Sequence, residues 1–162
     1  MRARVHGDPA RFETVATFVA QRYGRGVRYV ADVAGGQGLL ARALRKRHNY
    51  VAEVVDPRAW RVRGTTGEVR AFTVEDATYY DLVVGLHPDE ATRAVAESAL
   101  VRPVVLVPCC NFWDRTRRLG RDALLTEIEA FYRSRGVTCE RAELGFQGPM
   151  NIALVSSPPT VG

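Results

Sequence analysis

The sequence contains little lysine, little cysteine and no long apolar segment, and the last two shortages each exclude a class of protein. Lys46 is the only lysine, so arginine supplies almost all of the positive charge behind the net charge of +5 and the pI near 9.5. No apolar run approaches the roughly 18 residues that a membrane-spanning helix requires. The first residues, MRARVHGDPARF, lack the apolar core of a secretory signal. We therefore expect a cytoplasmic protein with no membrane partner.

Cysteine positions argue against both disulfides and zinc. Cys109, Cys110 and Cys139 are an odd number, and two of them are adjacent. A disulfide framework needs an even set of separated cysteines, and a zinc site needs ligands at regular spacings, which the scattered histidines do not complete. We expect no bound metal.

The length of 162 residues suits one domain with a real core, and we predict a single domain over residues 1–162. Hydrophobic residues at 46% and charged residues at 25% are ordinary for a globular protein. There is no repeat and no low-complexity linker. We expect an N-terminal helix within residues 1–24, beginning at Asp8-Pro9, and a frayed tail over 158–162. The oligomeric state stays open, with a dimer as one option.

Strand and helix patterns alternate along the chain, which predicts parallel βαβ units in a doubly wound sheet. The last two strands are joined by a segment too short for a crossover helix, so we expect them to be antiparallel. The predicted fold is α/β, with a mostly parallel seven-stranded sheet and an antiparallel C-terminal pair. The expected strands are 27–33, 50–55, 69–74, 80–86, 103–107, 137–144 and 151–156, and the later helices are 39–47, 88–100 and 121–135.

The segment VRYVADVAGGQGLL, residues 27–40, is the strongest local signal. An apolar strand turns on three glycines and continues as a helix, so a ligand can lie against the backbone and meet the unpaired N–H groups of the helix start. Asp56 ends the next apolar strand, 20 residues after Gly36, where dinucleotide folds bind ribose hydroxyls. The segment predicts an adenosine-containing cofactor at the carboxyl edge of the sheet.

Two cofactors compete for this turn. Gly36-x-Gly38-x-x-Ala41 satisfies the G-x-G-x-x-G/A pattern of nicotinamide-dependent enzymes. Asp32 argues against a dinucleotide, because a carboxylate just before the turn would repel a pyrophosphate. A ligand with a cationic amino group would instead be attracted to it.

Asp32 followed by Gly35, Gly36 and Gly38 resembles the first motif of the class I S-adenosylmethionine-dependent methyltransferases, and the closing strand pair resembles the last two strands of that fold. The resemblance extends from about residue 27 to residue 155. It implies S-adenosylmethionine as the cofactor, with its methionine part against Asp32, its ribose on Asp56 and its methyl near Leu86. The cofactor-binding residues that it implies are Asp32, Gly35, Gly36, Gln37, Gly38, Asp56, Pro57, Arg58, Asp76, Ala77 and Leu86.

Leu86-His87-Pro88 after the fourth strand and Cys109-Cys110 after the fifth resemble a methyltransferase-domain family that includes tRNA ribose 2′-O-methyltransferases. This chain departs from that pattern, with Asp89-Glu90 and Asn111-Phe112 where the family has Cys-Gly and an aromatic-His or His-His pair. The resemblance therefore implies the fold and the methyl donor of this chain, but it does not imply which acceptor is methylated.

Three residues are candidates for catalysis: His87, Cys109 and Asn111. A neutral His87 could accept a proton near pH 7, or it could be a hydrogen-bonded histidine of the core wall. Cys109 could add to carbon-6 of a pyrimidine, or it could be a small residue that packs the strand end. Asn111 could orient an amide or hydroxyl of the substrate.

Arginines and aromatic residues follow the second and fifth strands, at the predicted rim of the site. Guanidinium groups that bind phosphates beside aromatic rings that stack on bases are typical of proteins that bind RNA or single strands. The alternative is a solvated surface with buried tryptophan anchors. The predicted rim residues are Trp60, Arg61, Arg63, Phe112, Trp113, Arg115, Arg117 and Arg118.

The leading hypothesis is therefore an S-adenosylmethionine-dependent methyltransferase that acts on RNA, either tRNA or rRNA. A small-molecule methyltransferase is the second hypothesis, and it predicts a closed pocket over His87. A non-catalytic or partner-dependent binding module is the third, because the chain has no room for a separate target-recognition domain. A nicotinamide oxidoreductase is the fourth.

Overall fold

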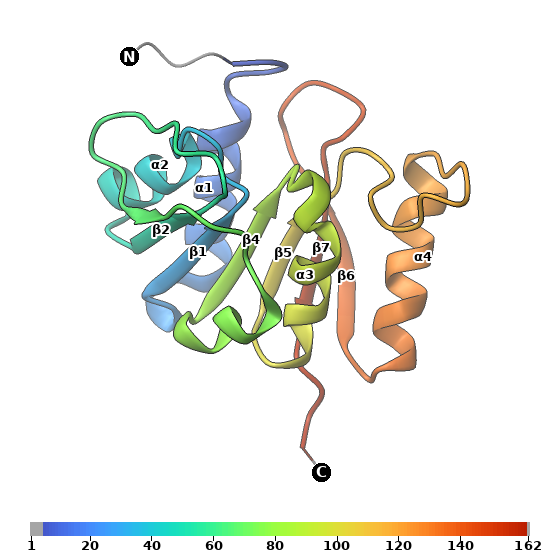
Figure 1. Cartoon of the computed structure of the whole chain (residues 1–162). Helices are drawn as coiled ribbons and strands as arrows, with labels where there is room; N and C mark the ends of the chain where they lie inside the picture. The colour runs from blue at the N-terminus through green and yellow to red at the C-terminus, as the bar shows by residue number, and fades with distance from the viewer. Residues whose placement is uncertain (1–4, 162) are drawn as a thin grey trace.

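A computed structural model describes residues 5–161, which form a sheet with helices on both faces (Figure 1). Residues 1–4 and 162, the two ends of the predicted single domain, lie outside the described residues. The seven strands lie in the order β3-β2-β1-β4-β5-β7-β6. The strands are β1 Tyr29–Val33, β2 Val51–Val55, β3 Gly67–Glu68, β4 Leu82–Leu86, β5 Val104–Val107, β6 Thr138–Glu143 and β7 Ile152–Ser157.

The register confirms the predicted fold class. Strands β1 to β5 pair in parallel, whereas β7 runs antiparallel between β5 and β6. The helices are α1 Arg11–Tyr23, α2 Leu39–His48, α3 Thr92–Glu97 and α4 Arg121–Ser134, with short 3-10 helices η1 Gly24–Gly26, η2 Val74–Tyr79, η3 Asp89–Ala91 and η4 Ser98–Leu100. No helix within residues 5–161 is long and apolar enough to cross a membrane.

Two apolar cores flank the sheet because successive strand side chains point to opposite faces. Val30 of β1 packs in one core with α1 and α2, and its neighbour Ala31 packs in the other core with α3 and α4. The five residues of β4 are all buried, as expected for a central strand that is covered on both faces. The cores hold the carboxyl ends of the parallel strands at one edge of the sheet.

The prediction of a third strand over residues 69–74 is wrong. The strand is the two-residue β3, Gly67–Glu68, and the chain then turns into η2. The Asp76 carboxylate accepts the backbone N–H of Thr73 at 2.8 Å, and the Thr73 side chain accepts the backbone N–H of Asp76 in return. This capping box directs the backbone into a helical turn, and such local side-chain bonds compete with strand pairing.

Helix α1 begins at Arg11 and not at Asp8-Pro9 as the sequence predicts. Oδ1 of Asp8 accepts the N–H of Ala10 at 2.9 Å, so Asp8 forms a turn before the helix. Its Oδ2 accepts the N–H of Gln147 at 2.8 Å. Asp8 thereby ties the N-terminal segment to the loop between β6 and β7.

Candidate active site

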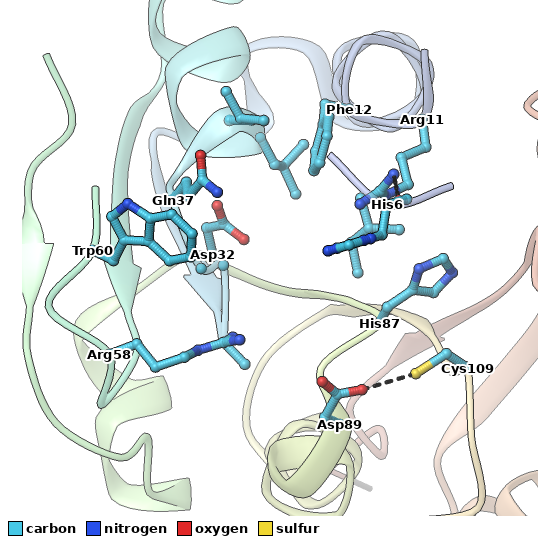
Figure 2. A pocket seen from close by; sticks show the side chains of 16 residues that line it. His6, Arg11, Phe12, Asp32, Gln37, Arg58, Trp60, His87, Asp89 and Cys109 are labelled. Carbon is cyan, nitrogen blue, oxygen red and sulfur yellow. Dashed lines mark hydrogen bonds between the residues drawn. The ribbon is translucent and has the colours of Figure 1, made fainter. Parts of the chain in front are cut away.

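A cleft of about 540 Å³ lies at the carboxyl edge of the parallel strands (Figure 2). Its floor is the turn between β1 and α2 and the loop that follows β4. The loop after β2 supplies one side, and the segment leading into α1 lies across the cleft from Asp89. The lining residues are His6, Arg11, Phe12, Asp32, Ala34, Gly35, Gly36, Gln37, Leu39, Leu40, Arg58, Trp60, Leu86, His87, Asp89 and Cys109.

Asp32 is a buried carboxyl group in the floor of this cleft, with 1% of its surface exposed. Its Oδ2 accepts the N–H of Ala41 in the first turn of α2 at 3.1 Å. Burial raises the pKa of Asp32 to about 7, with the Ala41 hydrogen bond and Arg61 opposing the rise and the nearby Asp56 charge adding to it. No ion pair to Asp32 exists among residues 5–161. A cationic group in the cleft would therefore find a carboxyl group that no described residue holds in an ion pair.

The glycine turn permits this arrangement because two of its residues have no room for a side chain. A Cβ on Gly35 would collide with the Asp32 carboxylate. Gly38 has a φ of 85°, and a Cβ there would lie 2.7 Å from Cγ2 of Thr65. The turn closes with the Gly38 N–H donating to the Gly35 carbonyl at 3.0 Å. The backbone of residues 35–37 consequently forms part of the cleft wall, where a ligand can approach it closely.

Asp56 lies beneath this turn and is fully buried. Its Oδ2 accepts the Gly36 N–H at 2.8 Å, and the Arg58 side chain donates to both oxygens, from Nε to Oδ1 at 3.0 Å and from Nη2 to Oδ2 at 2.8 Å. Burial alone would raise the pKa of Asp56, but the hydrogen bonds from Arg58 and Gly36 lower it overall. Asp56 is therefore an ionised carboxylate next to the glycine turn, and its partner Arg58 lines the cleft (Figure 2).

His87 follows β4 and lines the opposite part of the cleft from the glycine turn (Figure 2). Its Nε2–H donates to the carbonyl oxygen of Met150 at 2.8 Å, which leaves Nδ1 as the acceptor in the neutral ring. Burial lowers the pKa of His87 and outweighs the hydrogen bond to Met150, which raises it; the charge of Arg11 lowers the pKa further, and Asp89 has the smallest, raising effect. The imidazole is neutral at pH 7 and can accept a proton.

Cys109 follows β5 and reaches the cleft beside Asp89. Its Sγ–H donates to Oδ1 of Asp89 at 3.1 Å (Figure 2). Burial, followed by the hydrogen bond and charge of Asp89, raises the pKa of the Cys109 thiol to about 12. The group is a protonated thiol at pH 7, and nucleophilic attack requires the thiolate. The structure supports the packing and hydrogen-bonding alternative for Cys109.

Comparison with solved structures identifies the fold. The sugar N-methyltransferase KedS8 from Streptoalloteichus sp ATCC 53650 superposes with a TM-score of 0.60 at 17% identity, over 98% of each chain. S-adenosylmethionine-bound CalS10, an amino pentose methyltransferase from Micromonospora echinaspora, gives 0.58 at 13% identity over 96% of this chain and 99% of that one. Human N-acetylserotonin methyltransferase gives 0.54 at 12% identity over 93% of this chain and 52% of that one.

The chain has the class I methyltransferase fold. No protein-family profile matches the sequence, and no curated protein matches it either. The strand order with an antiparallel β7 between β5 and β6 also separates this sheet from the 3-2-1-4-5-6 order of dinucleotide-binding folds. The structure thus favours the methyltransferase fold over the nicotinamide-dependent alternative.

Within this class I methyltransferase fold, some of the predicted cofactor residues line the cleft and others do not. Asp32, Gly35, Gly36, Gln37, Arg58 and Leu86 line it. Gly38, Asp56, Pro57, Asp76 and Ala77 are not among the lining residues. Asp76 is engaged elsewhere, because Arg70 donates to its two oxygens at 2.6 and 3.0 Å while it caps η2. Its contact with the cofactor stays a prediction.

Asn111 lies outside the cleft lining. Its Nδ2 donates to the carbonyls of Asp114 and Arg117 at 2.6 and 2.8 Å. Its Oδ1 accepts the backbone N–H groups of Trp113 and Asp114 at 3.2 and 3.0 Å. These four bonds use the whole capacity of the amide and organise the loop after β5. The structure does not support Asn111 as a substrate-orienting group.

The predicted rim divides into residues that face solvent and residues that hold the fold. Trp60 lines the cleft and is 38% exposed. Trp113, predicted to stack on a base, is buried, with the Arg93 guanidinium 3.9 Å from its ring centroid and Phe131 at 5.3 Å. Arg61 donates to the Glu68 carbonyl oxygen at 2.6 Å, and Arg63 is exposed. Trp113 is thus a core anchor, which corrects its predicted role at the surface.

The remaining rim residues border a shallow groove beside the cleft, with a volume of about 590 Å³. Arg115 lies over the Phe112 ring at 4.7 Å and pairs with Glu90 at 3.4 Å, while Arg117 pairs with Glu127 at 3.0 Å. Arg118 is exposed and forms no ion pair with any residue that the structure describes. The groove combines apolar residues, Phe112 and Leu119, with three arginines.

Sequence reasoning missed seven lining residues, namely His6, Arg11, Phe12, Asp89, Ala34, Leu39 and Leu40. The first three come from the N-terminal segment, which the bond between Asp8 and Gln147 holds near the sheet edge. No local pattern in the sequence indicates this long-range tie. Asp89 did carry a signal, because it immediately follows His87-Pro88 at the end of β4, where the predicted site lies.

Proposed function

We propose that the protein is an S-adenosylmethionine-dependent methyltransferase whose acceptor is a small molecule. The observation that carries this proposal is the cleft that a buried Asp32, beside a glycine turn, and a neutral His87 both line. The solved structures that share the fold include enzymes described as acting on sugars and on N-acetylserotonin.

The residues of the cleft fit the proposed cofactor. Asp32 offers a carboxyl group without an ion-pair partner among the described residues, suited to the amino group of the methionine part. Gly35 leaves space that a Cβ would fill, and exposed Trp60 offers an aromatic face. When bound, S-adenosylmethionine supplies an electrophilic methyl group. Asp56 could take the ribose hydroxyls only if Arg58 moves away from its oxygens.

The protein's contribution to the reaction would be alignment and proton removal. His87 has a neutral ring with Nδ1 available as an acceptor, and it lies beside Arg11 and Asp89 in the cleft (Figure 2). Holding an acceptor in line with a methyl donor lowers the activation barrier of the transfer, because the entropy cost of orienting the two groups is met on binding. His6 and Arg11 of the N-terminal segment line the cleft together with His87, and a cleft of this size suits a small acceptor.

Calorimetry with S-adenosylmethionine and with its demethylated product, S-adenosylhomocysteine, tests the donor site. We expect saturable binding of both by the purified protein and weaker binding by Asp32→Asn. Absence of heat with either compound would contradict the proposal. Asp122→Asn, at an exposed position of α4, is the matched control and should bind like the unmodified protein.

RNA is a second candidate acceptor, favoured by the arginine-lined groove next to the cleft. Binding to phosphates by this groove should weaken steeply as salt rises from 50 to 300 mM. Replacing Arg117 and Arg118 by glutamine should then reduce methyl transfer to an RNA pool, whereas Arg133→Gln at the other end of α4 should not. Unchanged transfer to RNA in the double variant would exclude this groove as the RNA site.

A further inference from the structure

The loop after β4 holds two residues in an unfavourable backbone conformation, and both line the cleft. His87 has a φ of 50° and Asp89 a φ of 49°, a region that residues with a Cβ rarely adopt. The loop is fixed by the His87 N–H donating to the Val107 carbonyl at 2.8 Å and by Oγ1 of Thr92 donating to the Asp89 carbonyl at 2.6 Å. Such strain is retained where the surroundings impose it, commonly at functional sites.

Asp89 brings a second hydrogen-bond acceptor to the part of the cleft where His87 lies. Its Oδ1 accepts the thiol hydrogen of Cys109 at 3.1 Å. Its Oδ2 has no hydrogen bond, and the carboxylate has no ion pair, with any residue in 5–161. Figure 2 shows the Asp89 carboxylate directed from the floor toward the open part of the cleft.

The two residues therefore offer acceptors and no donor. Nε2–H of His87 is used by Met150, which leaves Nδ1 of the neutral ring, and the oxygens of a carboxylate only accept. A hydroxyl group has one hydrogen to give, whereas a primary amine has two or, when protonated, three. Two acceptors that line one space match an amine better than an alcohol.

On the basis of the proposed function, we propose that the acceptor is a small molecule with a primary amine, held by Asp89 and His87. The amine nitrogen forms a bond to the methyl carbon while the carbon–sulfur bond breaks and its electron pair moves to sulfur. The nitrogen gains a positive charge, and one of its protons passes to Nδ1 of His87. Asp89 stabilises the positive charge on nitrogen as it develops.

The other charged groups of the cleft are compatible with this step. Arg11 comes from the N-terminal segment, and its Nη1 donates to the carbonyls of His6 and Asp8 at 2.5 and 3.0 Å. Its charge disfavours a protonated amine before reaction, and only an unprotonated nitrogen has a lone pair for attack. Arg58, the other cation that lines the cleft, is neutralised by Asp56.

Binding of matched amine and alcohol pairs tests the proposal. Glucosamine and glucose, and 2,2,2-trifluoroethylamine and 2,2,2-trifluoroethanol, are titrated at pH 8, where both amines are largely unprotonated, into the protein saturated with S-adenosylhomocysteine. We expect each amine to bind about ten-fold more tightly than its alcohol, as for a site built around one hydrogen-bonding group. In Asp89→Asn the preference should fall below about three-fold, while the affinity for S-adenosylhomocysteine stays unchanged.

Glu90→Gln is the matched control, because Glu90 neighbours Asp89 in η3 but points to Arg115 outside the cleft. This variant should keep the full preference for amines. Equal binding of amines and alcohols, or a preference that survives in Asp89→Asn, would overturn the inference and leave the proposed function intact. Failure of S-adenosylhomocysteine to bind at all would overturn both.

Discussion

Replacing Asp32 by asparagine should stabilise the folded protein at alkaline pH while it weakens the proposed donor site. Burial raises the pKa of Asp32 from an ordinary 3.8 to about 7, so the folded state favours the protonated carboxyl. The contribution of this group to stability is fully present below pH 3.8 and is lost as pH rises through 7. Asparagine has a similar shape, keeps an oxygen for the Ala41 N–H and cannot ionise.

The size of the effect follows from the two pKa values. Each pKa unit corresponds to about 1.4 kcal/mol, so ionising Asp32 in the folded protein costs about 4 kcal/mol at pH 8. Between pH 5 and pH 8 the cost grows by about 3 kcal/mol. The free energy of unfolding of Asp32→Asn should gain that amount relative to the unmodified protein over this range.

Urea unfolding at pH 5 and pH 8, without ligand, measures this change. Asp122→Asn, which removes an exposed carboxylate of α4, is the control for the loss of a carboxyl group. If the difference for Asp32→Asn were the same at pH 5 and pH 8, Asp32 would not be a carboxyl group with a raised pKa. The reasoning about its unpaired burial would then be wrong.

Two further predictions concern the glycine turn and the thiols. Gly38→Ala should lower the free energy of unfolding, measured in urea, by about 1–3 kcal/mol, because φ is 85° and the new Cβ would meet Thr65. The same change should abolish binding of S-adenosylhomocysteine. An unchanged free energy of unfolding would contradict the close approach of Gly38 to Thr65. Iodoacetamide should modify exposed Cys110 before Cys109, because the Cys109 thiol stays protonated and bonded to Asp89. Peptide mass spectrometry after short labelling at pH 8 checks the order, and faster labelling of Cys109 would refute it.

The interaction between Asp56 and Arg58 shows that a residue can be placed correctly from the sequence while its availability to a ligand is not predicted. The carboxylate lies next to the glycine turn, as the spacing from Gly36 predicts. The neighbouring arginine nevertheless covers both of its oxygens. A long arginine side chain has many rotamers, and its sequence position does not say which partner it takes. The availability of Asp56 to a ribose is therefore a property of the folded cleft.

The predicted rim residues after β5 also show that residue type alone does not fix the role of a side chain. Trp113 and Asn111 are residue types that are common on recognition surfaces. Trp113 nevertheless packs against Phe131, and the Asn111 amide forms its hydrogen bonds within its own loop. An aromatic or amide side chain suits a ligand and a core equally well, so the residue type cannot choose between them. The choice is made by α4, which packs behind the loop.

The sequence by itself determined the order of strands and helices, the antiparallel closing pair and the glycine turn beside Asp32. These features depend on contacts between residues close in the chain, where periodicity and backbone restrictions act directly. Only the tertiary structure decided which polar groups remain free in the cleft and which residues cover it. His6, Arg11 and Phe12 reach the site because Asp8 bonds to Gln147, 139 residues away in the chain. Such pairings depend on how the packed elements meet, which no short segment of the sequence encodes.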